Sequence, residues 1–276
     1  MSKTIVTHLN PDFDGISAIW LLTRFHPDFK NSKFKFVPAG SSLNGKGYDS
    51  DPDIVHVDTG GGPFDHHDSN RYTCAAKLVW EHIKKTQNIK DAAVERMIDL
   101  SVAYDHAKDL EWNDADHDKY DLTFPAILTG WKMTNPGQHE KYVLDSLPIL
   151  DGLLNLFKAK VDAEKVIKNG KNFKTKWGKG LACLTKNEMI MHLAEKKGFV
   201  VVVRKDPLKG NVRIYSRGDK GVDLTEMYKL VQKKDPESDW FLHASNCLLL
   251  NGSSKNPGMR PTKLSLEKIV DILKKQ

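Results

Sequence analysis

The sequence predicts an α/β protein of two domains, in which an N-terminal doubly wound parallel sheet is followed by a smaller mixed α/β domain. Three observations support this prediction. The chain has 276 residues, more than one compact core usually holds. Strand-like and helix-like segments alternate through the first half, as they do where helices join parallel strands. A lysine-rich stretch then separates this half from a second set of strands and helices.

The first half opens with a short buried strand at 4–8, followed by a polar loop and a helix at 16–25. The same patterns predict further strands at 34–38 and 54–58, and helices at 74–85, 92–103, 122–131 and 142–166. A parallel sheet binds its ligands at the carboxyl ends of its strands. The residues that end or follow 4–8 and 54–58 are therefore the first candidates for a functional site.

The second half is expected to form a mixed domain. Its turn at 209–211 lies between two strand-like runs and suggests a hairpin. The strands are expected at 199–204, at 212–216 and within 241–250, and the helices at 224–233 and 266–274. We therefore predict a metal-binding catalytic domain at 1–140, a basic helical linker at 141–180 and a substrate-binding domain at 181–276.

Charge is distributed unevenly along the chain. The formal net charge is +6, but residues 1–140 hold 15 basic against 21 acidic residues, and residues 141–276 hold 27 against 15. The acidic half suits a concentration of carboxylates. The basic half suits a polyanionic partner, such as an oligonucleotide or single-stranded nucleic acid. A lysine-rich surface that is simply well solvated explains the same charge, and this alternative stays open.

Several classes of protein are not expected. The apolar runs are too short to cross a bilayer, so no membrane partner is predicted. No apolar signal segment follows Met1, and the widely spaced Cys74, Cys183 and Cys247 form no CxxC pair. These features favour a reducing, cytoplasmic location without disulfides or a thiolate zinc site. Neither HExxH nor PCxxC occurs, which argues against a zinc peptidase or deaminase.

Side chains that bind metals are concentrated after the predicted strands and one helix. They are His8, Asp12, Asp14, Asp58, Asp65, His66, His67 and Asp105. Taken alone, each group has an ordinary explanation as turn or packing residues. Their recurrence at successive strand ends favours a metal site. Carboxylates and imidazoles without thiolates suit Mn²⁺ or Fe²⁺ better than Mg²⁺, with Zn²⁺ and Co²⁺ as alternatives.

In this order, the groups resemble the motifs of the DHH phosphoesterase superfamily. That superfamily includes RecJ-type single-strand exonucleases, oligoribonucleases, cyclic-dinucleotide phosphodiesterases and manganese-dependent inorganic pyrophosphatases. The resemblance implies two Mn²⁺ ions in the N-terminal domain. It implies that His8 and Asp12 hold one ion, that Asp14, His66 and Asp105 hold the other, and that Asp58 bridges the two. It also implies that His67 faces the substrate phosphate and that Asp65 orients a histidine.

The second half resembles the DHH-associated C-terminal domain, in the segments 212–217 and 221–224. This implies that Arg217 meets a substrate phosphate. The counterpart of the family's GGGH loop is 251–258, which makes Gly252, Ser253 and Ser254 candidate substrate contacts. The loop lacks the histidine, for which His243 is the candidate replacement. The separation of Asp58 and Asp65 is also shorter than in most members, and both departures bear on the substrate.

The sequence thus predicts a manganese-dependent phosphoesterase with a two-metal mechanism. It would hydrolyse phosphodiester or phosphomonoester bonds of nucleotides, short oligonucleotides or single-stranded nucleic acid. An inorganic pyrophosphatase is the nearest alternative enzyme, although the Arg-Lys-Lys cluster usual in that group is not found, and 259–263 is the closest stretch. A non-catalytic nucleic-acid-binding protein is the alternative from another class. The oligomeric state is open, with a homodimer as one option.

Overall fold

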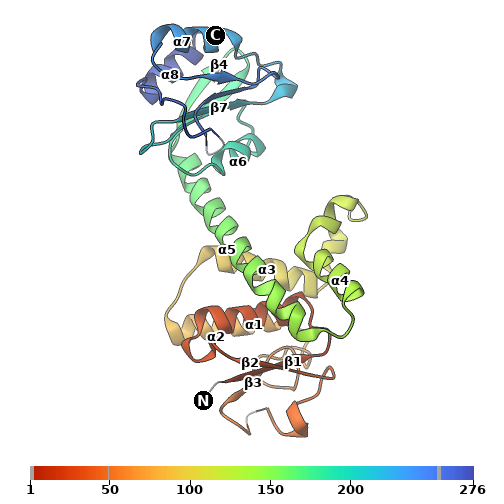
Figure 1. The fold of residues 1–276 in the computed structure, drawn as a ribbon. Helices are drawn as coiled ribbons and strands as arrows, with labels where there is room; N and C mark the ends of the chain where they lie inside the picture. The colour runs from red at the N-terminus through yellow and green to blue at the C-terminus, as the bar shows by residue number, and fades with distance from the viewer. Residues whose placement is uncertain (1–2, 49, 254–255) are drawn as a thin grey trace. The chain divides into compact units, whose positions relative to one another are not determined.

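The computed structural model describes residues 3–48, 50–253 and 256–276. The chain divides into two compact units, Met1–Phe157 and Lys158–Gln276, each with its own sheet (Figure 1). The predicted α/β class, the parallel N-terminal sheet and the mixed C-terminal sheet are confirmed.

The sheet of the first unit has three parallel strands in the order β2-β1-β3. They are β1 (Thr4–His8), β2 (Lys33–Val37) and β3 (Ile54–His56). Strand β1 is the central strand, and its residues Ile5 and Val6 are fully buried. The parallel arrangement places the carboxyl ends of β1 and β3 at the same edge of the sheet.

Helices α1 (Phe13–Phe25), α2 (Ala75–Gln87) and α3 (Ala92–Asp105) pack against one another on one side of this sheet (Figure 1). The rings of Trp20 and Trp80 are buried and meet the edge of Phe25 at centroid distances of 5.6 and 5.4 Å. This aromatic contact fixes α1 against α2. Two short 3₁₀ turns, η1 (Pro27–Phe29) and η2 (Leu43–Gly45), complete the connections between the strands.

Further elements follow α3: the 3₁₀ turns η3 (Lys108–Glu111) and η4 (Asp118–Leu122), then α4 (Phe124–Thr134) and α5 (His139–Asn169). The ring of Phe13 meets those of Tyr104 and Phe124 edge to face, at 5.8 and 5.7 Å. These contacts hold α4 beside α1 and α3. Although α5 has 31 residues, neither it nor another helix in the described parts of the chain is apolar enough to span a membrane.

The second unit has a six-stranded sheet in the order β4-β5-β6-β7-β9-β8. All neighbouring strands are antiparallel except β5 and β6. The strands are β4 (Lys171–Thr175), β5 (Gly178–Leu184), β6 (Val201–Lys205), β7 (Val212–Ser216), β8 (Phe241–Leu242) and β9 (Leu248–Asn251). The helices are α6 (Ile190–Lys196), η5 (Gly218–Lys220), α7 (Thr225–Lys234) and α8 (Leu266–Leu273).

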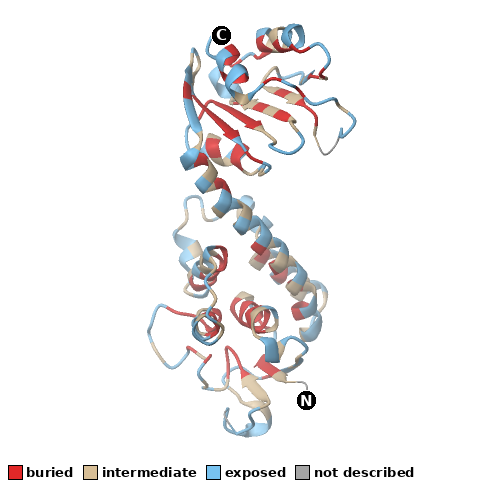
Figure 2. Ribbon diagram, turned by 90° about the vertical axis from the view of Figure 1, so that its left-hand side faces the viewer, coloured by how far each residue is buried: buried red, intermediate tan, exposed pale blue. Residues whose placement is uncertain are grey.

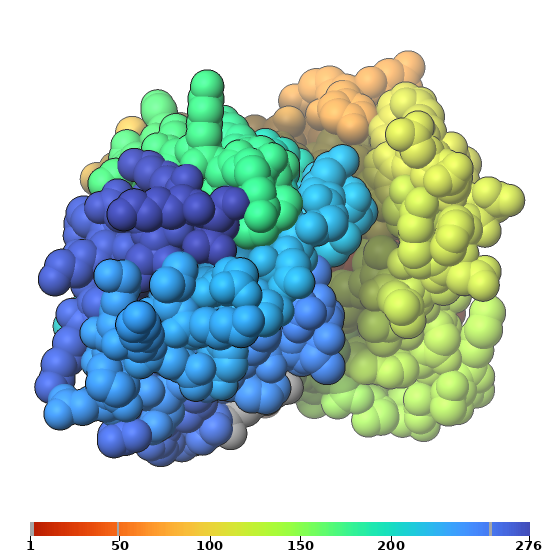
Figure 3. Space-filling view, turned by 90° about the horizontal axis from the view of Figure 1, so that it is seen from above, coloured from red at the N-terminus to blue at the C-terminus, as the bar shows by residue number. Residues whose placement is uncertain are grey.

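The central strands β5 and β6 of this second sheet have consecutive buried residues, whereas buried and half-buried residues alternate in β7 and β9 (Figure 2). Side chains alternate between the faces. Val201 and Val203 pack in the core under α7 and α8, whereas Val202 packs with residues of α6 and the end of α5. Helices α7 and α8 lie side by side on their face (Figure 3). The near-continuous apolar run in β6 follows from this double coverage.

Some elements differ from the sequence-based prediction. The segment 171–184, partly assigned to a basic linker, forms the β4–β5 hairpin. Because β4 is an edge strand, Lys171 and Lys174 are exposed and only Phe173 is buried. The strand is therefore as rich in lysine as an exposed linker, which explains the wrong assignment. Helix α6 was not predicted. The single strand expected within 241–250 is a pair, β8 and β9, whereas the predicted hairpin around 209–211 is confirmed by the antiparallel β6 and β7.

Gly180 of β5 lies directly against the ring of Phe173, and a Cβ at this position would come within 2.5 Å of ring atoms. The ring would have to move out of its buried position. We expect Gly180→Ala to lower the free energy of unfolding by about 1–3 kcal/mol, measured by urea denaturation. Gly152→Ala in α5, where an added Cβ meets nothing within 4 Å, is the control and should not destabilise. Equal stability of the two variants would contradict this packing.

Candidate metal centre

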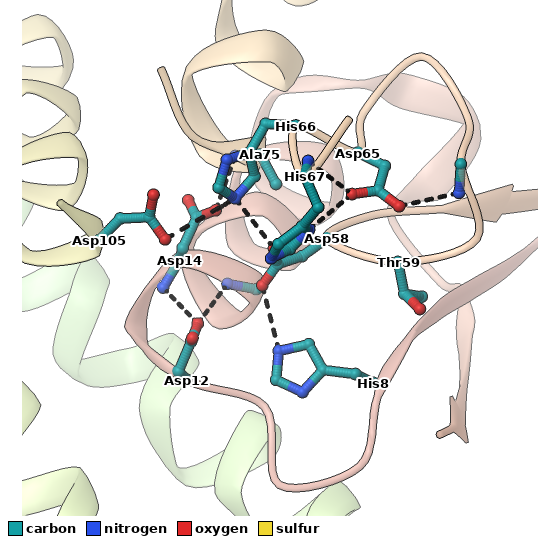
Figure 4. Close-up of polar contacts among 12 residues, drawn as sticks. His8, Asp12, Asp14, Asp58, Thr59, Asp65, His66, His67, Ala75 and Asp105 are labelled. Atoms are coloured by element: carbon teal, nitrogen blue, oxygen red, sulfur yellow. Dashed lines mark hydrogen bonds and ion pairs between the residues drawn. The ribbon is translucent and has the colours of Figure 1, made fainter. Parts of the chain in front are cut away.

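The carboxyl ends of β1 and β3 bring His8 and Asp58 together (Figure 4). His8 is the last residue of β1. The N–H of Val57 donates to the carbonyl of Val6 (2.9 Å), so the chain continues along β1 for one residue beyond β3. Nε2 of His8 then lies 3.1 Å from Oδ2 of Asp58. The parallel pairing of two strands thus creates a contact between residues 50 positions apart.

Asp58 has an unusual backbone conformation, with φ at +59°. Residues other than glycine seldom adopt this left-handed region, at a cost of about 1–2 kcal/mol. The conformation is held by the N–H of Asp58, which donates to the carbonyl of Phe64 (2.9 Å). Gly15 provides room for the carboxylate, since a Cβ there would lie 3.1 Å from Oδ2 of Asp58. Strain of this kind is concentrated at functional sites.

Asp12 and Asp14 have different positions at the start of α1. Asp12 caps the helix, and its Oδ1 accepts the N–H groups of Asp14 (2.9 Å) and Gly15 (3.1 Å). Asp14 is buried, and its two oxygens accept the N–H groups of Ala75 (2.6 Å) and Ala76 (2.9 Å) at the start of α2. These N–H groups favour the ionised carboxylate, but burial and then the neighbouring Asp58 outweigh them and raise the pKa of Asp14 to about 7.

His66 supplies the most informative atom of the cluster. Its Nε2 is buried and has no hydrogen-bond partner within the described residues. It lies 3.4 Å from Oδ1 of Asp58, 3.7 Å from Oδ2 of Asp14 and 3.7 Å from Oδ1 of Asp105, the last residue of α3. A buried nitrogen that forms ion pairs with three carboxylates but a hydrogen bond with none of them suits a ligand that shares a cation with them.

The candidate ligand atoms form three overlapping sets, each with all atoms within 4.8 Å of one another. These sets are His8, Asp12 and Asp58; Asp14, His66 and Asp105; and Asp58, His66 and His67. Asp58 is common to the first and third sets and borders the second through its contact with His66. The donors are oxygen and imidazole nitrogen, which suit a hard or borderline divalent cation.

The electrostatics of the cluster favour positive charge at its centre. The hydrogen bond to Asp58 raises the pKa of His8 to about 9, and the other ring nitrogen, Nδ1, contacts the carbonyl of Leu9 (2.8 Å). The same Asp58 carboxylate raises the pKa of His66. Burial acts to raise the pKa of Asp58, but the imidazoles of His66 and His8 outweigh it and lower that pKa. Protons on the two histidines thus supply the charge that a cation would bring.

Asp65 and His67 form a pair beside the cluster. Nδ1 of His67 donates to Oδ1 of Asp65 (2.7 Å), while the other oxygen of Asp65 accepts the N–H of Gly61 (2.8 Å). Gly61 has φ at +69°, a conformation that glycine adopts without strain. The His67 side chain is 63% exposed, and its Nδ1 lies 4.0 Å from Oδ1 of Asp58. Asp65 therefore orients His67 at the solvent side of the cluster.

Two neighbouring residues have roles that the sequence does not indicate. Nε2 of His106 donates to the carbonyl of Thr73 (2.9 Å), which gives this histidine a structural partner. Lys132 of α4 lines a cavity of about 180 Å³ together with Asp12, Asp14 and Asp105. No motif surrounds Lys132 in the sequence, and the packing of Phe124 of α4 against Phe13 helps to bring it to the cluster.

The candidate substrate residues of the second unit fall at opposite ends of its sheet. Arg217 directly follows β7 and His243 follows β8, both level with the start of β9. Gly252 and Ser253 follow the other end of β9 and line a different cavity. Ser254 lies outside the described residues. The guanidinium of Arg217 is paired with Asp219 through two hydrogen bonds, of 3.0 and 2.7 Å.

Comparison with known proteins gives little guidance. No family model matches the chain, and no curated protein sequence is similar to it. One solved structure, described as the DHH domain of a member of a family of ribosomal proteins, aligns with 99% of this chain and 86% of its own. The sequence identity is 15% and the TM-score is 0.34. At this TM-score, the likeness supports no inference about the site.

A cation must displace the protons of His8 and His66, because the pKa of each is raised. Below the ordinary histidine pKa of about 6.5, protons compete fully with the cation for these imidazoles. This competition ends as the pH rises through about 9. We expect Mn²⁺ affinity to increase from pH 6 to 9, with proton release measured by calorimetry in buffers of different ionisation enthalpy. His8→Gln should reduce this release, and His192→Gln, which changes an exposed side chain of α6, should not. An affinity independent of pH would contradict the assignment.

Proposed function

We propose that the chain is a divalent-metal-dependent phosphoesterase of the DHH type. Its substrates would be nucleotides, short oligonucleotides or single-stranded nucleic acid, and Mn²⁺ would be its cation. One observation carries the proposal: the buried Nε2 of His66, which makes no hydrogen bond within the described residues, lies within 3.7 Å of three carboxylates. His8, whose Nε2 contacts the other oxygen of Asp58, forms a further candidate ligand set with Asp12 and Asp58 and would provide the second half of a two-cation site.

The ligand assignment follows two of these sets, which are connected by the contact of His66 with Asp58. His8 and Asp12 would hold one cation, and Asp14, His66 and Asp105 would hold the other, with Asp58 shared. When bound, such a pair of cations lowers the pKa of a water molecule and neutralises charge on a phosphate. The chain itself supplies the preorganisation. Asp14 is anchored by two N–H groups of α2, and Asp58 is held by its strained but hydrogen-bonded turn.

His67 is proposed to contact the substrate phosphate. Its Nδ1 is occupied by Asp65, so the opposite ring edge, with Nε2, is the edge available to a ligand. When protonated, this histidine can donate a charge-assisted hydrogen bond to a phosphate oxygen. The hydrogen bond from Nδ1 to Asp65 fixes the orientation of the ring.

In the second unit, Arg217 and His243 are the better candidates for a substrate phosphate. The N–H of Ser216 donates to the carbonyl of Cys247, and that of His243 donates to the carbonyl of Leu248, both at 2.9 Å. These bonds bring the residues after β7 and β8 to one end of the sheet. Gly252 and Ser253 lie at the other end, so one phosphate group cannot engage both pairs. A phosphate would have to replace Asp219 as the partner of Arg217.

We place this activity in the cytoplasm, where the free Cys74, Cys183 and Cys247 would stay reduced. The basic balance of residues 141–276 supports a polyanionic substrate over a small one.

The test is Mn²⁺-dependent hydrolysis of pyrophosphate, adenosine 3′,5′-bisphosphate, a cyclic dinucleotide, RNA of two to five nucleotides and longer single-stranded DNA. We expect hydrolysis of a nucleotide substrate, lost on chelation. Asp58→Asn should reduce the rate by at least about a hundredfold, because it removes a shared ligand. Asp116→Asn in the exposed acidic segment is the matched control and should leave the rate unchanged.

The panel also separates the alternatives. Preference for pyrophosphate would favour a pyrophosphatase. Binding of single-stranded DNA without hydrolysis of any substrate, by protein that carries Mn²⁺, would favour a non-catalytic protein. Full activity of Asp58→Asn would show that the site has been assigned to the wrong residues.

A further inference from the structure

A cavity of about 180 Å³ lies beside the candidate metal cluster. One wall contains the carboxylates of Asp12, Asp14 and Asp105. Helix α4 forms another wall and contributes Thr129 and Lys132, which are three positions apart and so share a face of the helix. Lys132 is the one cationic side chain among the described residues that line this cavity.

Several contacts fix the position of Lys132. Its Nζ donates to the carbonyl of Asn10 (3.1 Å), in the loop that joins β1 to α1 and carries Asp12. The N–H of Asn10 in turn donates to Nδ1 of His139 (3.1 Å) at the start of α5. The lysine is half-buried, and this burial lowers its pKa although the nearby Asp12 opposes the change. An ammonium has three N–H donors, and the carbonyl of Asn10 occupies one.

The charge balance of the site shows why a cation is needed here. When ionised, Asp12, Asp14, Asp58 and Asp105 carry four negative charges, which two divalent cations balance. A phosphate group and an attacking hydroxide then add negative charge to a site that is already neutral overall. Uncompensated charge in a partly buried site is costly. In addition to His67, a positive group near the phosphate would offset this charge, and Lys132 lines the same cavity as the carboxylates of Asp12, Asp14 and Asp105.

We propose that this cavity is a phosphate subsite in which the ammonium of Lys132 binds a non-bridging oxygen of the substrate phosphate. The inference rests on the proposed function and extends it, because it assigns a substrate contact to α4, outside all the recognised motifs. The N-terminal unit thereby carries a phosphate-binding cation of its own. The ligand class is an anionic phosphate oxygen adjacent to the cations.

The test compares Lys132→Met, Lys132→Arg and the control Lys141→Met, a lysine of α5 that pairs with Asp145. Affinity for inorganic phosphate is measured by calorimetry on the Mn²⁺-loaded proteins. We expect Lys132→Met to bind phosphate about 10- to 100-fold more weakly, as befits the loss of a charge-assisted hydrogen bond. Lys132→Arg keeps the charge and should stay within a few-fold of the wild type, and Lys141→Met should match it. The Mn²⁺ stoichiometry should be the same in all four proteins.

Steady-state kinetics on the preferred substrate provides the second readout, with a comparable loss of kcat/KM expected for Lys132→Met alone. If the wild type hydrolyses this substrate but Lys132→Met binds phosphate as tightly as the wild type, the subsite is wrong and the phosphoesterase assignment stands. If phosphate binding depends on Lys132 but no substrate is hydrolysed, the subsite stands and the enzymatic function is wrong. Failure of the Mn²⁺-loaded wild type to bind phosphate would overturn the subsite.

Discussion

The buried carboxylate of Asp58 is the constraint on which the N-terminal unit depends. Only 3% of this residue is exposed, and a buried charge requires partners of opposite charge. His8 and His66 provide these partners from the end of β1 and from the loop after β3. Two features of the backbone allow the carboxylate to reach these histidines: the positive φ of Asp58 and the absence of a side chain at Gly15. The fold is therefore organised around a centre that attracts cations.

How much of this could be predicted from the sequence depends on the kind of residue. His8, Asp12 and Asp14 could be found because they follow a recognisable strand, and parallel strands direct such residues to one edge. The family resemblance also implies that Asp58 lies between the two histidine-containing ligand sets, but the positive φ at Asp58 could not be predicted from the sequence. Lys132 could not be found either. It reaches the cluster through the aromatic packing of α4, about 120 positions after Asn10, which it contacts.

In the second unit, the lysine-rich composition of the edge strand β4 led to the wrong prediction of a linker. The lysines of β4 resemble those of a linker because an edge strand exposes one of its sides and uses charge to avoid pairing with other chains. Strand register decides which candidate residues can act together. Arg217 and His243 share one end of the sheet, whereas Gly252 belongs to the other, and no spacing in the sequence distinguishes these cases. The N-terminal site could be read from motifs, but the substrate contacts required the topology.

The central claim is that Asp58 is shared by two cations. Electron paramagnetic resonance during titration with Mn²⁺ tests it directly, because two Mn²⁺ ions that share a carboxylate couple magnetically. The account predicts two bound ions per chain and a coupled spectrum that disappears in Asp58→Asn. A single bound ion per chain, or two ions with the six-line spectrum of isolated Mn²⁺, would contradict it.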